Sequence, residues 1–199
     1  MTYSTEIIAA FLTGILGPLL VQFYINRTKK IKEKNTDPIA EQCALYSQID
    51  TKLEKIRETY KADRVWITQF HNGGYFYPSG KSIQKFSMFY EVLTLNTESV
   101  KMIFQNIPVS LFSRSTNYLL ENTHLAIFDF KNENINDLGL KYTAAETNTK
   151  GGYYFAIKNI DGKFIGVLGL DYCKKKVILD TEQITALNVE AGVFSGYLY

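Results

Sequence analysis

The strongest candidates for chemistry in this chain are the polar residues that follow the apolar stretch at 65–70. His71 and Asn72 precede two glycines there. A histidine at the end of a strand can contact a ligand or a metal, and glycine amides can approach a small anion. Alternatively, both side chains close the strand by local hydrogen bonds and the glycines supply positive φ. We favour this second interpretation for His71, because no partner at metal-ligand spacing accompanies it.

An aromatic loop with nearby lysines follows the two glycines. Tyr75 and Tyr77 could stack on a planar ligand. Lys81 and Lys85 could counter a phosphate or carboxylate, and Glu91 could meet one of them if it faces inward. The competing interpretation is a solvent-facing aromatic patch used in dimerisation or lipid contact. The predicted ligand-binding residues are His71, Asn72, Tyr75, Tyr77, Lys85 and Glu91.

The sequence contains no recognised catalytic motif. A Walker loop, a G-x-S-x-G elbow and an H-E-x-x-H pair are all absent. His124 is expected to be a capping or surface residue, and Cys43 and Cys173 lie far apart without C-x-x-C partners. Isolated cysteines of this kind fit a reducing compartment and argue against zinc. We therefore expect neither an enzyme nor a metal site.

The elements that must position these residues begin with an apolar N-terminal run. Residues 7–25 carry no charged side chain, and a basic cluster follows at 27–34. About 19 residues at about 1.5 Å each match a hydrocarbon core of about 30 Å, so the run predicts a single transmembrane helix. The basic flank places the C-terminal part in the cytoplasm by the positive-inside rule. A signal peptide would need a basic leader, which the run lacks. A buried core helix would need a polar face, which the run also lacks.

The rest of the chain is long enough for one ordinary domain. The predicted organisation is a transmembrane helix with its basic segment at 1–34, a linker helix at 35–62 and a domain at 63–199. Outside the basic cluster the charge is near neutral, so no basic face argues for nucleic-acid binding. The lipid bilayer is the expected partner of the N-terminal segment.

The linker helix is predicted to begin at Asp37 and Pro38, which suit the N-cap and the first helical position. Its apolar residues fit a heptad seam. They are Ile39, Tyr46, Ile49, Leu53, Ile56 and Tyr60. This stripe could form a coiled-coil contact or pack on the domain's own sheet, and the sequence leaves both open.

The domain is predicted to contain a sheet and several helices. Runs of β-branched and aromatic residues indicate strands, and helical spacing indicates helices. Asp180 and Gln183 form a capping-box pattern at the start of the last helix. The predicted strands are 65–71, 84–93, the short piece 107–109, and 153–158 and 163–172 joined by an Asp-Gly turn; the predicted helices are 99–105, 111–121, 138–146 after a loop, and 181–198.

The order of elements in the last third resembles the GAF family of sensor domains. The resemblance rests on the extended segment 153–158, the Asp-Gly turn, the glycine-containing strand 164–170 and the acid-capped final helix. It implies an α+β fold with an antiparallel sheet flanked by helices, often dimeric through its terminal helices and often holding a small ligand. The family uses cyclic nucleotides, tetrapyrroles, haem and small metabolites, so the resemblance fixes no cofactor.

These features together predict a membrane-anchored, cytoplasmic GAF-like module that senses a ligand and signals through partner or oligomer contacts. The expected form is a homodimer through the helices at 39–60 and 181–198. The alternative is a non-catalytic membrane-tethered scaffold, or a phage or mobile-element membrane factor, that binds no small ligand. Occupancy of a pocket by a small molecule distinguishes the two.

Overall fold

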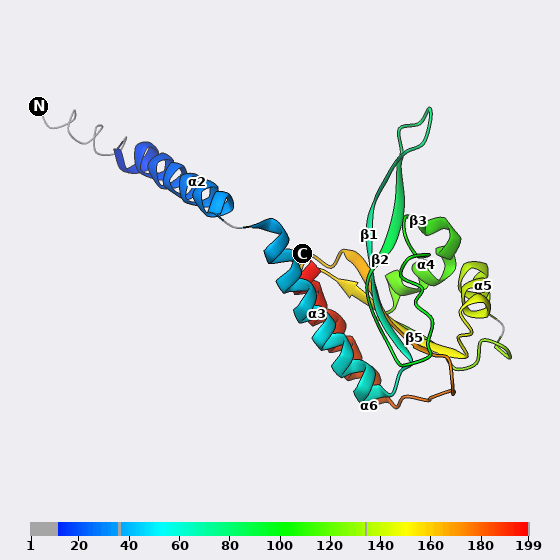
Figure 1. Cartoon of the computed structure of the whole chain (residues 1–199). Helices are drawn as coiled ribbons and strands as arrows, with labels where there is room; N and C mark the ends of the chain where they lie inside the picture. The colour runs from blue at the N-terminus through cyan, green and yellow to red at the C-terminus, as the bar shows by residue number, and fades with distance from the viewer. Residues whose placement is uncertain (1–11, 36, 134, 199) are drawn as a thin grey trace, which may run out of the picture. The chain divides into compact units, whose positions relative to one another are not determined.

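The computed structural model describes residues 12–35, 37–133 and 135–198, and the chain divides into two compact units, residues 1–45 and 46–199. The first unit contains the short π-helix η1 (Leu12–Leu16) and helix α2 (Gly17–Asn35), labelled in Figure 1. No helix within the described ranges is long and apolar enough to span a membrane. Residues 7–11 of the predicted spanning segment lie outside those ranges.

Helix α3 (Pro38–Tyr60) begins where the sequence predicts, because the Asp37 carboxylate accepts a hydrogen bond from the Ile39 amide at 2.9 Å. Within the second unit its apolar stripe is buried: Ile49 and Leu53 are fully inaccessible to solvent. Tyr46 meets Tyr90 of the sheet edge to face, with ring centroids 5.1 Å apart. The part of the stripe from Tyr46 onward therefore packs on the chain's own sheet.

The second unit is built on a six-stranded antiparallel sheet of order β3-β2-β1-β6-β5-β4 (Figure 1). Its strands are β1 (Arg64–Tyr75), β2 (Ser82–Leu93), β3 (Ile107–Pro108), β4 (His124–Ile127), β5 (Gly151–Lys158) and β6 (Phe164–Tyr172). The two long hairpins, β1-β2 and β5-β6, meet through β1 and β6 at the centre of the sheet. The predicted α+β fold with an antiparallel sheet is thus confirmed.

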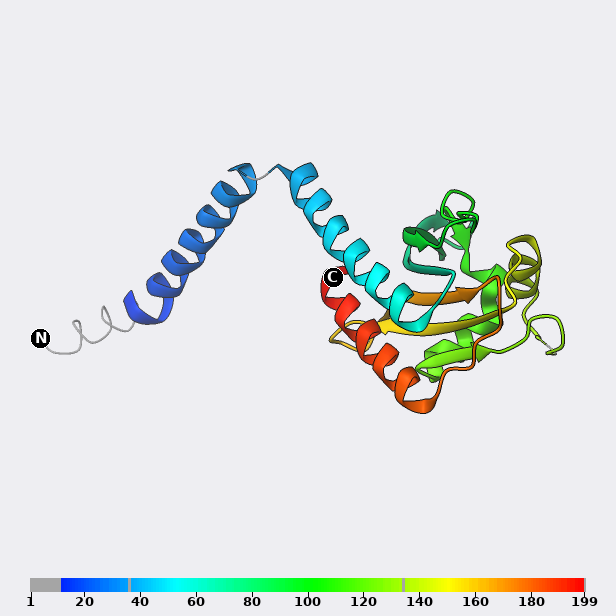
Figure 2. The ribbon, with the colours of Figure 1, turned by 60° about the horizontal axis from the view of Figure 1, so that its bottom comes forward.

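Helices cover both faces of this sheet (Figures 1 and 2). Helices α3 and α6 (Thr181–Leu198) lie side by side on one face, joined by an ion pair of 2.8 Å between Lys52 and Glu190. The predicted capping box of α6 is confirmed, since Asp180 and Gln183 exchange side-chain-to-amide hydrogen bonds at 2.8 and 3.0 Å. The other face carries the 3₁₀ turn η2 (Val109–Phe112), α4 (Ser113–Glu121) and α5 (Leu138–Glu146).

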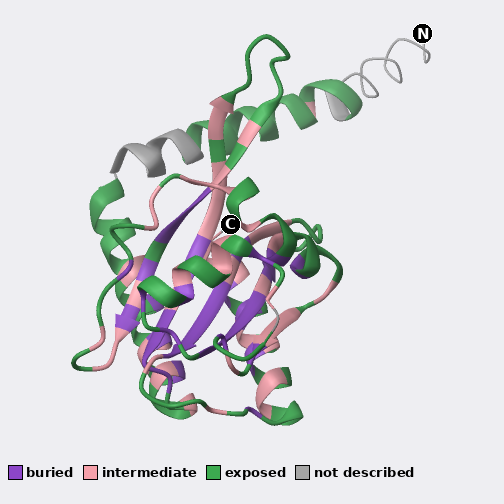
Figure 3. Ribbon diagram, turned by 90° about the vertical axis from the view of Figure 1, so that its right-hand side faces the viewer, coloured by how far each residue is buried: buried purple, intermediate pink, exposed green. Residues whose placement is uncertain are grey.

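Strand alternation sends neighbouring side chains into these two layers. Val65 and Ile67 of β1 are fully buried on the side of α3 and α6, while Arg64 and Trp66 point to the opposite side. Figure 3 shows the central strands buried along most of their length. The sheet therefore separates an apolar core under α3 and α6 from a second compartment under α4 and α5.

The structure differs from the predicted order of elements at two places. Residues 99–105 form turns instead of a helix. The Val100 amide donates a hydrogen bond to the Glu91 carboxylate at 2.9 Å, and the Met88 amide donates one to the Phe104 carbonyl at 2.8 Å. These contacts hold the segment along β2. His124 begins strand β4, which the sequence analysis did not predict, because residues 124–127 do not alternate between polar and apolar side chains.

The packing of Tyr90 predicts an alkaline loss of stability. Burial first, and then Tyr46 and Asp50, raise the pKa of Tyr90 to about 12. An unfolded tyrosine titrates near pH 10, so above that pH the unfolded state loses its proton first and the stabilisation falls by about 1.4 kcal/mol per pH unit until about pH 12. Below pH 10 the contribution is complete.

The Tyr90→Phe variant should therefore be less sensitive to alkali than the unsubstituted chain. Urea unfolding at about pH 9 and about pH 11 measures this effect. The difference in the free energy of unfolding between the two proteins should change by about 1 kcal/mol from one pH to the other. Tyr77→Phe is the matched control, because Tyr77 is 97% exposed. Equal alkaline losses in Tyr90→Phe and the unsubstituted chain would refute the assignment.

Candidate functional site

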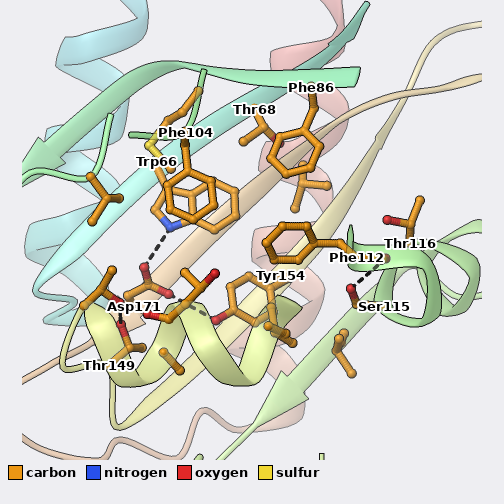
Figure 4. A pocket seen from close by; sticks show the side chains of 18 of the residues that line it. Trp66, Thr68, Phe86, Phe104, Phe112, Ser115, Thr116, Thr149, Tyr154 and Asp171 are labelled. Carbon is orange, nitrogen blue, oxygen red and sulfur yellow. Dashed lines mark hydrogen bonds between the residues drawn. The ribbon is translucent and has the colours of Figure 1, made fainter. Parts of the chain in front are cut away.

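A cavity of about 80 Å³ lies between the sheet and the layer formed by η2, α4 and α5 (Figure 4). Strands β1, β2, β5 and β6 supply its floor and the helices its cover. Most of its wall is aromatic or aliphatic, and one end is polar. The apolar part includes Trp66, Phe70, Phe86, Met88, Phe104, Phe112 and Leu119, and the polar end comprises Arg64, Thr147, Thr149, Tyr154 and Asp171.

The polar end is organised around a buried ion pair. Arg64 Nε donates to Asp171 Oδ2 at 2.9 Å, and the two residues are only 1% and 5% exposed. The same oxygen accepts the Trp66 indole N–H at 2.8 Å. The second carboxylate oxygen accepts the Tyr154 hydroxyl at 3.2 Å. Three hydrogen-bond donors therefore offset the cost of removing the Asp171 carboxylate from water, as a buried charge requires.

The Arg64 guanidinium keeps unused donors. Its Nη1 donates to the Glu98 carbonyl and its Nη2 to the Thr149 hydroxyl, both at 3.0 Å. Thr149 in turn exchanges a hydrogen bond of 2.8 Å with Thr147. A guanidinium has five N–H groups, and the described residues take three of them. Two N–H groups of Arg64, a residue that lines the cavity, therefore have no hydrogen-bond acceptor among the described residues.

The protonation states of this cluster follow from its depth. Burial alone lowers the pKa of Arg64, but the charge and hydrogen bond of Asp171 outweigh it and the pKa is raised. Burial, followed by the Asp171 charge, lifts the pKa of Tyr154 well above its usual value. Burial also raises the pKa of the neighbouring Cys173 thiol. Arg64 therefore keeps its charge, while Tyr154 and Cys173 stay neutral.

Two strand glycines make room for the aromatic members of the cluster. Gly169 lies opposite Trp66 in the β1-β6 ladder, and a Cβ there would stand 2.2 Å from the indole ring. A Cβ on Gly152, opposite Asp171, would stand 2.3 Å from the Tyr154 hydroxyl. Because these positions lack side chains, the indole and the phenol can lie across the sheet and reach Asp171.

The cover of the cavity is held by one acidic residue. Asp137, 6% exposed, accepts the Leu140 amide at 3.0 Å as the N-cap of α5. Its other oxygen accepts the Ser115 amide at 2.8 Å and the Ser115 hydroxyl at 2.9 Å, in the first turn of α4. Phe112 closes the adjoining wall by meeting Phe86 edge to face at 5.4 Å. The two cover helices are thus fastened to each other.

The structure places the predicted ligand residues outside this cavity. His71 lies on β1, with Nε2 2.9 Å from the Ser87 hydroxyl, and Asn72 accepts the Gly74 amide at 2.9 Å. Tyr75 is the last residue of β1 and Tyr77 lies in the loop that follows, and they are 68% and 97% exposed. His71 and Asn72 therefore make local contacts inside β1, which continues past them to Tyr75 and does not close there.

The last two predicted residues lie on β2. Lys85 pairs with His71 in the strand register, whereas Glu91 lies further along the strand, opposite Trp66, and binds the 99–101 turn. The structure therefore gathers five of the six residues along the outer half of the hairpin and leaves Glu91 apart, and none of them lines the cavity. Their role in ligand binding stays a prediction.

The cavity residues that the sequence analysis missed come from distant segments. Arg64, Thr149 and Asp171 are brought together only by the pairing of β1 and β5 with β6. One signal was present in the sequence: Arg64 and Asp171 are charged residues directly beside apolar runs of their strands. A charge in such a position needs a partner of opposite sign.

Comparison with solved structures agrees with this architecture. A GAF domain of Slr1393 from Synechocystis, in its photoproduct state, superposes with a TM-score of 0.61 at 15% identity over 78% of this chain and 93% of that one. The fold is that of a GAF domain. The blue-light absorbing form of the Thermosynechococcus elongatus PixJ GAF domain gives 0.63 at 14% identity over 82% and 89%. A phycoerythrobilin-bound GAF domain from a cyanobacterial phytochrome gives 0.62 at 14% identity over 77% and 84%. No family model and no curated protein matches this chain.

A tetrapyrrole does not fit the cavity as its side chains lie. The volume of about 80 Å³ is smaller than the roughly 150 Å³ of an engineered cavity that holds benzene. Among the described residues that line it, none is a cysteine or a histidine, so it presents neither a thiol for covalent attachment nor an imidazole for haem iron. The GAF fold is combined here with a small cavity that has one polar end.

Proposed function

We propose that this chain is a sensor module without catalysis of its own, and that the cavity under α4 and α5 receives a small neutral molecule. The observation that carries the proposal is the buried pair of Arg64 and Asp171 at the end of an apolar cavity. A buried ion pair is a poor source of stability compared with apolar packing. Perturbed charged groups facing a cavity are typical of binding sites.

The chemistry of the cavity defines the molecule. The charges of Arg64 and Asp171 cancel, so a neutral polar group suits the polar end better than a phosphate or carboxylate. Arg64 has N–H donors to spare, and the Asp171 oxygen that binds Tyr154 keeps a free lone pair. A primary amide satisfies both. Because the cavity of about 80 Å³ is smaller than one that holds benzene, an aromatic ring enters it only when α4 or α5 moves outward.

A route from the cavity to the helices on the opposite face follows from strand alternation. Next to Asp171, the hydroxyl of Tyr172 donates to the Tyr60 carbonyl at the end of α3, at 2.9 Å. Next to Tyr154, the hydroxyl of Tyr153 accepts the Leu179 amide just before α6, at 2.8 Å. A molecule that shifts Asp171 or Tyr154 would thus act on both helices, which is how we propose the signal leaves the domain.

We further propose that the module is anchored in a membrane through residues 7–25, with the domain on the cytoplasmic side, and that it pairs with a second copy through 39–60 and 181–198. The uncharged run and its basic flank support the anchor. Val189 and Val193 on the outer face of α6 are 63% and 41% exposed, which supports the pairing. Nucleic acid is not among the proposed partners.

Benzamide is the probe that tests the cavity. At a concentration 100 times its dissociation constant it should stabilise the full-length chain by about 2.7 kcal/mol, which for a domain of this size raises the melting temperature by roughly 5–10 °C. Toluene lacks the amide and should bind more weakly, by about 0.5–1.5 kcal/mol per hydrogen bond. Thermal unfolding monitored by circular dichroism measures the shift in melting temperature with benzamide and with toluene.

Two variants make the result specific. Ala144→Leu extends a side chain on α5 into the cavity and should abolish the shift, provided its melting without benzamide remains cooperative. Tyr77→Ala changes a residue in the hairpin loop and should retain the shift. Loss of the shift in Tyr77→Ala alone would favour the hairpin site instead. No shift with benzamide or toluene would favour the ligand-free scaffold.

A further inference from the structure

The β1-β2 hairpin continues beyond the rest of the sheet, and its tip is exposed (Figures 1 and 3). The side chains of Tyr75, Phe76 and Tyr77 are 68%, 56% and 97% exposed. Three consecutive exposed aromatic residues are unusual on a soluble surface and mark an interaction site.

The tip is a closed turn that holds these side chains outward. The Phe76 amide donates to the Lys81 carbonyl, and the Gly80 amide donates to the Phe76 carbonyl, both at 2.8 Å. At its base, Asn72 accepts hydrogen bonds from the Gly74 amide at 2.9 Å and from the Ser82 hydroxyl at 3.1 Å. The aromatic residues are therefore displayed by a hydrogen-bonded scaffold.

The tip is also uniformly basic. Residues 71–85 contain Lys81 and Lys85 but no aspartate or glutamate. Neither lysine takes part in an ion pair within the described parts of the chain. The stem of Lys85 lies over Gly73, where a Cβ would be 2.5 Å from Lys85 Cδ. Apolar and cationic surface are thus combined in one projecting turn.

We propose that this tip, residues 75–77 with Lys81 and Lys85, docks on an anionic lipid bilayer. Tyrosine rings prefer the headgroup level of a membrane, where one end is apolar and the other wet. Lysines are attracted to anionic lipid at close range. A specific protein partner would need about 800 Å² of matching surface, which a single turn does not supply, whereas a bilayer requires no matched shape. This contact involves neither the cavity nor residues 7–25.

A second tryptophan tests the proposal in the full-length chain. Trp66 faces the cavity and is hydrogen-bonded there, so tryptophan at position 77 adds a separate reporter at the tip. With vesicles of phosphatidylcholine and phosphatidylserine that carry brominated acyl chains, Tyr77→Trp should lose emission that the unsubstituted protein keeps. Vesicles of phosphatidylcholine alone should quench it much less.

The controls separate the tip from the rest of the molecule. Tyr142→Trp places the reporter on α5 at a residue that is 70% exposed and should not be quenched. Adding Lys81→Gln and Lys85→Gln to Tyr77→Trp should lower the ratio of docked to free tip about 30-fold, which corresponds to about 1 kcal/mol per lysine.

Three results would overturn the proposal. They are equal quenching of Tyr77→Trp by both kinds of vesicle, equal quenching of Tyr142→Trp, and an emission change of Tyr77→Trp on raising the protein concentration without lipid. The last would identify a second copy of the chain as the partner. None of these results bears on the benzamide shift, so the two proposals succeed or fail separately.

Discussion

Replacing Asp171 by alanine is expected to lower the free energy of unfolding by about 3–5 kcal/mol, because it leaves a buried charge without its partner. Arg64 is 1% exposed and would keep its charge, and its remaining partners are a carbonyl and a hydroxyl. Trp66 and Tyr154 would each lose their acceptor as well. Urea unfolding of the full-length chain measures the loss.

Glu190→Gln is the matched control, since its pair with Lys52 is half-exposed and such pairs contribute about 0.2–1 kcal/mol. Asp171→Asn adds a second comparison, because it removes the charge and leaves one acceptor oxygen, which can serve the indole or the phenol but not both where they now lie. Its loss should fall between those of the other two variants. If Asp171→Ala were no more destabilising than Glu190→Gln, the buried pair would not have the role assigned to it.

Replacing Gly169 by alanine is expected to cost about 1–3 kcal/mol through overpacking. The new Cβ would lie 2.2 Å from two carbons of the Trp66 ring, and the indole cannot slide away without breaking its hydrogen bond to Asp171. Because Trp66 also lines the cavity, the variant should weaken benzamide binding.

Gly192→Ala provides a control of opposite sign. This glycine lies on α6 with open space around its position, and alanine in a helix is favoured by roughly 0.5–1 kcal/mol over glycine. In a Trp66→Leu background, Gly169→Ala should become nearly neutral, because the colliding ring is gone. A stabilising Gly169→Ala in the natural background would show that the indole does not need this space.

Local patterns predicted the parts of this fold that depend on neighbouring residues. The capping box of Asp180 and Gln183, the start of α3 at Asp37 and the helix at Leu138–Glu146 all depend on contacts within a few positions. The 99–105 segment had helical composition, but amides at its start donate hydrogen bonds to Glu91 on the adjacent strand β2. A carboxylate beyond the reach of helical spacing therefore overrode the local preference.

The candidate site was predicted less well for a related reason. His71 and its neighbours drew attention because they are polar, aromatic and adjacent in sequence, yet they lie along a projecting hairpin. The cavity cluster joins Arg64 and Asp171, which are more than one hundred positions apart. Nothing in the spacing of such residues shows that they meet.

Sequence alone determined the alternation of strands and helices, the caps, the glycine-rich β6 strand and the aromatic, acid-free composition of the hairpin loop, because each is written in residues that are close along the chain. Only the tertiary structure decided which strands are neighbours. That pairing places Gly169 under Trp66 and Asp171 beside Arg64, and it divides the side chains between two compartments. Long-range pairing is selected by the burial of a whole sheet, a sum over many contacts that no single motif records.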